Sequence, residues 1–166
     1  TAPHRGQRFP WVTHPEVTEL ALGGARLAAP ATSLRIDKSE RLLFLLDKAG
    51  QPLAALSISI GSASDPLPVG RQEIKSAVKN PMFAVTPAML KGSPPAGTRL
   101  VIAPGPNNPV GLYWLGLNKP HWGIHGTPEP GRIGQDETDG CVRLTNWDVL
   151  RVVQAVKIGL VVDVQA

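Results

Sequence analysis

Glycine and proline interrupt this chain so often that few stretches could form a long helix. The 166 residues include 17 glycines and 17 prolines, about a fifth of the chain, whereas average usage of the two types is about an eighth. Proline stops a helix because it lacks a backbone N–H, and glycine weakens one through its conformational freedom. The sequence therefore excludes a helical bundle and favours short strands joined by turns.

The rest of the composition indicates a single folded domain. Hydrophobic residues make up 42% of the chain and charged residues 18%, which is enough apolar material for one core and too little charge for a disordered chain. The longest apolar stretch, 149–164, is interrupted by Arg151, Gln154, Lys157 and Asp163. A bilayer span needs about 18 or more apolar residues in succession, so we expect no stable membrane insertion.

Charge and the N-terminus give only broad expectations about partners and location. Seventeen Lys and Arg face 13 Asp and Glu, for a net charge of +4. The basic residues form no stripe, so the charge suits an anionic polymer such as bacterial cell wall and predicts no nucleic-acid partner. The chain starts at Thr1 with no signal sequence, which fits a mature or trimmed chain and leaves an earlier export signal as an open alternative.

The hydrophobic pattern changes at Ser33. Residues 1–32 contain four prolines and no sustained period, so we predict an N-terminal arm or linker there, with one helical turn at 15–22. Residues 33–166 form the predicted domain. Its first three strands are expected to be antiparallel, because two short turns join them.

Within the domain, short runs with the period of a β-strand alternate with turns. The predicted strands are 34–36, 42–46, 53–60, 70–78, 98–103, 110–117, 122–125 and 158–164. The proline-rich segment 80–97 is predicted to be an irregular loop, of the kind that often covers a binding site. Thr145 can cap a helix with apolar positions at helical spacing, namely Val149, Leu150, Val153 and Val156. The predicted fold is mainly β, with one late helix.

The only cysteine, Cys141, is the first candidate for chemistry. It follows Gly140, which allows unusual backbone conformations, and the N–H groups of Gly140 and Cys141 could face a developing oxyanion. His125 lies sixteen residues upstream, and the intervening loop can fold back to bring the imidazole to the sulfur. Such a histidine takes the thiol proton and holds the thiolate as an ion pair.

Other interpretations of these residues stay open at this point. A lone cysteine is often a small buried hydrophobe, and a lone histidine often has no catalytic role. Zinc could recruit His121, His125, Asp139 and Cys141, but none of them has the short spacing of common zinc sites. Arg143 follows Cys141 by two residues, so on a strand it shares its face; it could grip a substrate carboxylate or remain a solvated charge.

The sequence around these residues resembles the bacterial L,D-transpeptidase catalytic domain, the YkuD-like family. The family pattern is His-Gly-Thr, a loop, and then Ser-His-Gly-Cys-Ile/Val-Arg-Leu. The matching segments are His125-Gly126-Thr127 and Thr138-Asp139-Gly140-Cys141-Val142-Arg143-Leu144, preceded by Leu67-Pro68-Val69-Gly70, Lys79-Asn80-Pro81 and the run Pro104-Gly105-Pro106-Asn107-Asn108-Pro109-Val110-Gly111. The resemblance covers about residues 33–165 and implies a mixed β-sandwich or barrel.

The resemblance also implies a role for each matched site residue. Cys141 takes the place of the nucleophile, His125 that of the general base, and the carbonyl of Gly126 that of the group orienting the imidazole. The residues expected to bind substrate are Arg143, Asp139 and Thr127. Thr138 and Asp139 depart from the family's Ser-His, and a carboxylate this near the sulfur should raise the pKa of the thiol unless a cation offsets it.

The implied reaction is acyl transfer on peptidoglycan stem peptides through a thioester. An amine of a second stem would give a 3→3 cross-link, a lysine of a lipoprotein would attach that protein to the wall, and water would make the enzyme an L,D-carboxypeptidase. The resemblance implies no metal or organic cofactor, and it implies export to the periplasm. A non-catalytic wall-binding module with the same fold is the alternative of another class, with Asp139 as the departure that motivates it.

Overall fold

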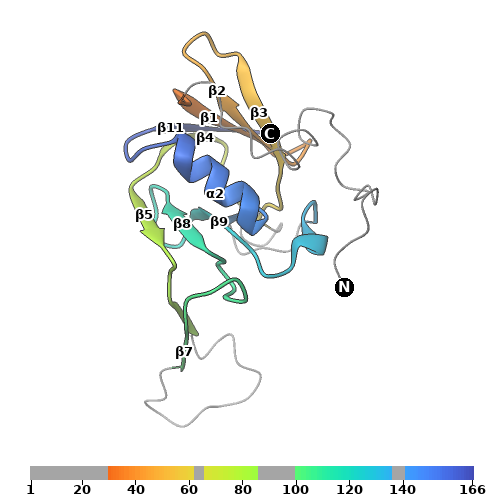
Figure 1. Cartoon of the computed structure of the whole chain (residues 1–166). Coiled ribbons are helices and arrows are strands. Elements are labelled where there is room, and N and C mark those ends of the chain that lie inside the picture. Colours follow the sequence, from red (N-terminus) through yellow and green to blue (C-terminus); the bar gives the residue numbers. More distant parts are fainter. Residues whose placement is uncertain (1–29, 62–65, 86–99, 136–140) are drawn as a thin grey trace, which may run out of the picture.

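The computed structural model describes residues 30–61, 66–85, 100–135 and 141–166 (Figure 1). A first sheet contains five strands in the order β3-β2-β1-β11-β4. These are β1 (Ser33–Asp37), β2 (Leu42–Leu46), β3 (Pro52–Ser57), β4 (Gly70–Glu73) and β11 (Val161–Gln165). β1 and β11 pair in parallel and the other neighbours are antiparallel, so the predicted antiparallel start of the fold is confirmed.

A second sheet carries the strands around the cysteine, in the order β10-β9-β8-β5. These are β5 (Ser76–Lys79), β8 (Tyr113–Gly116), β9 (Gly123–His125) and β10 (Val142–Arg143). A separate two-stranded ribbon, β6 (Phe83–Val85) with β7 (Leu100–Ile102), extends away from the first sheet (Figure 1). A 3₁₀ helix, η2, spans Pro130–Arg132.

Helix α2 (Asn146–Ala155) lies between the first sheet and strands β8 and β9 (Figure 1). The predicted cap is confirmed, since the Thr145 side chain accepts a hydrogen bond from the N–H of Asp148. Val149 and Val152 of this helix are fully buried, in one core cluster with residues of both sheets. The mainly β fold with a late α-helix is thus confirmed, and no helix within the described ranges is long and apolar enough to cross a membrane.

The predicted strand 70–78 is wrong as a single element. β4 belongs to the first sheet and β5 to the second, and the backbone changes sheets between Ile74 and Lys75. The N–H of Ile74 donates to Leu160, whereas that of Lys75 donates to Gly116. Gln72 and Ile74, before this change, are both buried, whereas Ala77, Val78 and Lys79 of β5 are all exposed.

Two other predicted strands are shorter in the structure. Strand 110–117 begins only at Tyr113, because Gly111 has a left-handed φ of 65° and ends a turn. The last strand begins at Val161, after a turn in which Gly159 has φ 91°. Segment 80–97, predicted to be irregular, contains strand β6; its residues 86–97 lie outside the described residues.

The N-terminal prediction falls largely outside the description, including the helical turn at 15–22. At its end, the N–H of Ala31 donates to Ala155 at the end of α2, and that of Thr32 donates to Leu46 on β2. Ala31 is also part of the core cluster. The last residues of the predicted arm therefore pack on the domain, and the boundary at residue 33 stays a prediction.

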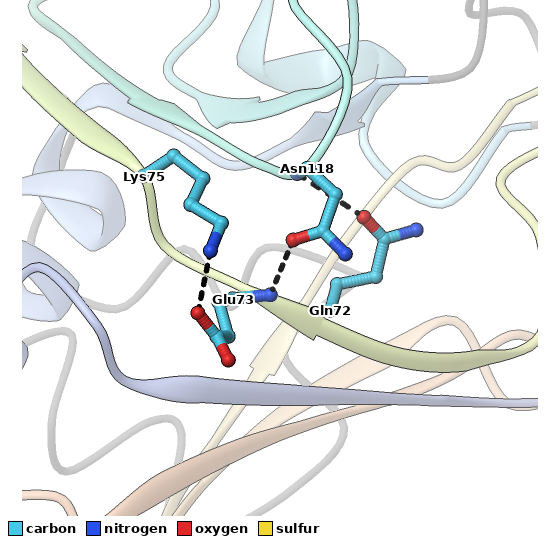
Figure 2. Close-up of polar contacts among 4 residues, drawn as sticks. All are labelled: Gln72, Glu73, Lys75 and Asn118. Atoms are coloured by element: carbon cyan, nitrogen blue, oxygen red, sulfur yellow. Dashed lines mark hydrogen bonds and ion pairs between the residues drawn. The ribbon is translucent and has the colours of Figure 1, made fainter.

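Polar contacts fix the β8–β9 connection to the first sheet (Figure 2). The side-chain oxygen of Asn118 accepts a hydrogen bond from the N–H of Glu73 at 3.0 Å, and the N–H of Asn118 donates to Gln72 at 3.4 Å. Lys75 forms an ion pair with Glu73 at 2.6 Å. The two contacts of Asn118 hold the hairpin that contains His121, whereas the ion pair joins two residues of the β4–β5 segment.

Candidate active site

One face of the second sheet carries the chemistry-bearing side chains. The register places Val78 opposite Trp114, Trp114 opposite His125, and His125 opposite Arg143. Residues paired in this way point to the same side of a sheet, so the four form a row across β5, β8, β9 and β10. Their neighbours in sequence point to the opposite face, which packs on the core. Leu115, Ile124 and Val142 are fully buried there.

His125 is buried, with 3% of its surface exposed. Its Nδ1 lies 2.6 Å from the carbonyl oxygen of Gly126. A carbonyl can only accept a hydrogen bond, so Nδ1 carries the proton in the neutral ring and Nε2 is left as the proton acceptor. The geometry is the one in which Gly126 orients the imidazole.

The buried position of His125 lowers its basicity. Burial is the main cause that lowers the pKa of this imidazole to about 4; the hydrogen bond to Gly126 acts in the opposite direction, and the positive charge of Arg143 lowers the pKa further. At neutral pH the ring is therefore uncharged. Desolvation and a neighbouring cation both disfavour the imidazolium, and the predicted imidazolium–thiolate ion pair stays a prediction.

Cys141 is partly buried and lies just before β10. Its Sγ is 3.1 Å from the carbonyl oxygen of His121, to which the thiol S–H donates. The main chain of His121 thus reaches the sulfur, while its ring packs edge-on against Trp122 with centroids 5.3 Å apart. Cys141 is two residues from Arg143, the register partner of His125, so the predicted nucleophile directly precedes the strand that pairs with the strand of the predicted base.

The backbone of Arg143 is held by two hydrogen bonds, whereas the Nε of its side chain has no hydrogen-bond partner among the described residues. Its N–H and carbonyl both bond to Ser59, at 2.9 and 3.0 Å. The Nε of Arg143 is buried and has no hydrogen-bond partner among the described residues. A buried guanidinium nitrogen without a partner is costly unless a ligand supplies an acceptor.

The remaining predicted site residues are only partly placed. Gly140 and Asp139 lie outside the described residues. Thr127 is 4% exposed, and its hydroxyl oxygen accepts a hydrogen bond from the N–H of Glu129 at 3.1 Å. This contact closes a local turn, and a substrate-binding role for Thr127 stays a prediction.

Sequence reasoning missed Trp114. Its indole is stacked on the His125 imidazole, with centroids 5.5 Å apart and an interplanar angle of 17°. A tight hairpin closed at 118–121 would place residue 114 opposite residue 125, so the hairpin geometry is the signal that could have found it.

The residues weighed for zinc do not form a metal site in the described part of the chain. There, no group of three or more His, Cys, Asp or Glu side chains is arranged to hold a metal ion. Asp139, one of the four residues considered, is outside the description.

Comparison with known proteins identifies the family. The model of the YkuD L,D-transpeptidase catalytic domain matches residues 31–164, so this chain belongs to that family, a family of enzymes. A putative L,D-transpeptidase YkuD of Bacillus subtilis is 31% identical over 106 residues, which are 63% of this chain and 61% of that protein. A probable L,D-transpeptidase YbiS of Escherichia coli K12 is 31% identical over 127 residues, 75% of this chain and 41% of that protein.

Solved structures agree in fold. The L,D-transpeptidase 3 of Mycobacterium tuberculosis in complex with a faropenem-derived adduct matches with a TM-score of 0.60 at 20% identity, over 82% of this chain and 61% of that one. The catalytic domain of the Enterococcus faecium L,D-transpeptidase matches with a TM-score of 0.59 at 19% identity, over 83% of this chain and 99% of that one. This chain spans from about two fifths to three fifths of the length of the two curated relatives.

Proposed function

We propose that this domain is a cysteine-dependent L,D-transpeptidase that acts on peptidoglycan stem peptides. The observation that carries the proposal is the arrangement of His125, whose Nδ1 is held by the Gly126 carbonyl at 2.6 Å and whose strand pairs with the strand that follows Cys141. The family match to residues 31–164 supports the same reaction class.

In the proposed first half-reaction, Nε2 of His125 takes the proton of the Cys141 thiol as Sγ attacks a carbonyl carbon of the donor peptide. The attacked carbonyl belongs to the third residue of a tetrapeptide. The C–N bond to the terminal D-alanine then breaks, and His125 returns the proton to the departing amine. A thioester on Cys141 remains.

The low pKa of His125 determines when the proton moves in this step. An imidazole with a pKa of about 4 does not hold the proton of a resting thiol, whose usual pKa is about 8.5. Proton transfer is therefore expected to accompany attack, when negative charge moves from sulfur to the carbonyl oxygen. The N–H groups of Gly140 and Cys141 are the proposed donors to that oxyanion.

In the second half-reaction an acceptor nucleophile attacks the thioester. It loses a proton to His125, the C–S bond breaks, and the thiol of Cys141 is restored. An amine from a second stem peptide gives a 3→3 cross-link, a lysine of a lipoprotein attaches that protein to the wall, and water gives hydrolysis. We propose that the reaction takes place in the periplasm, where stem peptides are exposed.

Arg143 is the proposed contact for a substrate carboxylate, with Asp139 and Thr127 as further proposed contacts. The buried, unpartnered Nε of Arg143 supports this role, because a carboxylate can accept from a guanidinium in a bidentate manner. The same positive charge would favour an anionic donor peptide over a neutral one.

The test is incubation of the protein with purified disaccharide tetrapeptide, followed by mass analysis of the products. We expect release of D-alanine together with cross-linked dimers or a shortened tripeptide, and the product ratio identifies the acceptor. The variants C141A and H125A are the matched controls. Absence of any product from the parent protein under conditions where it is folded would favour a non-catalytic wall-binding module instead.

A further inference from the structure

Two glycines lie beside the indole of Trp114 on the face of the second sheet that carries His125. Gly116 on β8 pairs with Gly123 on β9, next to the pair formed by Trp114 and His125. A Cβ at Gly123 would lie 2.5, 2.6 and 2.8 Å from three atoms of the indole ring. A Cβ at Gly116 would first meet the Oγ of Ser76 and would lie 3.2 Å from the indole Nε1. The indole therefore occupies the space that a side chain at Gly123 would fill, and it borders the space at Gly116.

This placement directs the indole against the imidazole of His125. The two rings are stacked, with an interplanar angle of 17°. The Gly126 carbonyl holds the Nδ1 edge of the same imidazole. One contact restrains an edge and the other restrains a face, so rotation of the ring about its bond to Cβ would break both.

We propose that Trp114 is a positioning residue for His125: packed against Gly123, its indole fixes the plane of the imidazole and keeps water from one of its faces. The inference rests on the proposed function for its catalytic consequence. Its structural part, the coupling of Trp114 to His125, is measurable without any turnover.

Among the described residues, few charged groups lie beside this ring. On β10 the guanidinium of Arg143 is the register neighbour of His125, and the thiol of Cys141 precedes that strand. β8 contributes only the uncharged Trp114 to this row, and the residue beyond it on β5 is Val78. Helix α2 approaches the backbone of Gly126 through two uncharged side chains, Asn146 and Val149.

Loss of the indole has two opposing effects on the imidazole. Entry of water removes part of the desolvation that lowers the pKa of His125, which would raise the pKa. Loss of a cation–π contact would lower it, because an indole face favours the imidazolium. Burial is the main cause of the low pKa, so the first effect should dominate.

The experiment is an NMR titration of the His125 ring in the parent protein and in the variants W114A, W114F and G123A. In W114A we expect the pKa of His125 to rise by about one or more, because an imidazole face opens to water. W114F keeps an aromatic ring, so the pKa of His125 should stay close to that of the parent. G123A keeps Trp114 but pushes the end of the indole away from its position, so the pKa of His125 should also rise in this variant.

Trp147 provides a matched control. It is another tryptophan near the site, at the start of α2, with 46% of its surface exposed. W147A should leave the titration of His125 unchanged. If W114A and G123A are folded by circular dichroism and His125 titrates as in the parent, the proposal is overturned; a fall in the pKa of His125 would also overturn it.

The catalytic consequence is read from the pH profile of Cys141 acylation by a carbapenem. In W114A the acid limb should move to higher pH, together with a loss of rate of about tenfold at neutral pH from poorer orientation. If C141A is still acylated, the proposed function fails while the titration result stands. If His125 titrates in W114A as it does in the parent, while the carbapenem acylates the parent and not C141A, the inference on Trp114 fails and the proposed function stands.

Discussion

His125 and Cys141 each present a proton to a backbone carbonyl, and this shared feature defines the resting state of the site. Nδ1–H of His125 faces Gly126, and the thiol of Cys141 faces His121. Both groups are neutral in this arrangement. A neutral pair has to separate charge during attack, so the rate should depend strongly on the base and on the oxyanion donors.

The first prediction follows for the proposed base. H125A should lower the rate of acyl transfer by roughly 10²–10⁴, the usual contribution of a positioned general base. H121A is the control, because only the main-chain carbonyl of His121 contacts the sulfur, and that carbonyl survives the substitution. Initial rates with disaccharide tetrapeptide measure both variants. A larger loss in H121A than in H125A would show that the wrong histidine has been paired with Cys141.

The second prediction concerns Arg143. R143K keeps the charge but loses the planar fork, so use of the tetrapeptide should weaken by roughly 1–3 kcal/mol, mainly in KM. Acylation by a carbapenem should be less affected. The comparison of kcat/KM for the two reagents, with a thermal melt of each variant, is the measurement. Equal losses for both reagents with a lowered Tm would instead assign Arg143 to the scaffold.

Part of the site could be predicted from single residues and part could not. Cys141, His125 and Arg143 could be proposed because they stand in short motifs, and the structure pairs His125 with Arg143 on adjacent strands; their catalytic and binding roles stay predictions. The state of His125 was not found, since its low pKa depends on burial by residues distant in sequence. The predicted roles of Gly140 and Asp139 are untested, because both lie outside the described residues.

The positions of β4 and β5 depend on backbone contacts between distant residues, which the pattern of apolar and polar residues does not show. Residues 70–78 were predicted as one strand, but the backbone hydrogen bonds change partners between Ile74 and Lys75 and divide the segment into β4 and β5. By contrast, β1, β2 and β3 were predicted well, because short turns join them. The cap of α2 was also predictable, since Thr145 acts through a local contact.

The third prediction tests the connection that fixes the β8–β9 hairpin. N118A removes the acceptor for the N–H of Glu73 and should lower the free energy of unfolding by about 1 kcal/mol, the typical net value of a hydrogen bond. K75A breaks an ion pair whose side chains are 53% and 39% exposed, so its effect should be near zero. Urea unfolding of both variants measures the difference. An equal or larger loss in K75A would contradict this account of the hairpin.

At the scale of the whole molecule, the buried imidazole links stability to pH. His125 has a pKa of about 4 in the folded chain, against an ordinary value of 6.5 for a histidine side chain. The unfolded chain therefore binds a proton first as pH falls, and the free energy of unfolding should decrease between about pH 6.5 and 4. The full difference corresponds to about 3 kcal/mol.

The fourth prediction isolates this contribution. The parent should lose more stability than H125N between pH 7 and pH 4, by up to about 3 kcal/mol. Asp148 acts with the opposite sign, since burial raises the pKa of its carboxyl, but it is present in both proteins and cancels in the comparison. Urea unfolding at several pH values gives both curves. Parallel curves would show that His125 is not the group responsible.

The central claim is that Cys141 carries the acyl group, and trapping the acyl-enzyme tests it most directly. The folded protein is incubated with a carbapenem, its intact mass is measured, and the adduct is located by peptide mapping. We predict one adduct per chain on the peptide that contains Cys141, and none in C141A. An adduct that persists in C141A, or a parent protein that stays unmodified while folded, would contradict the account.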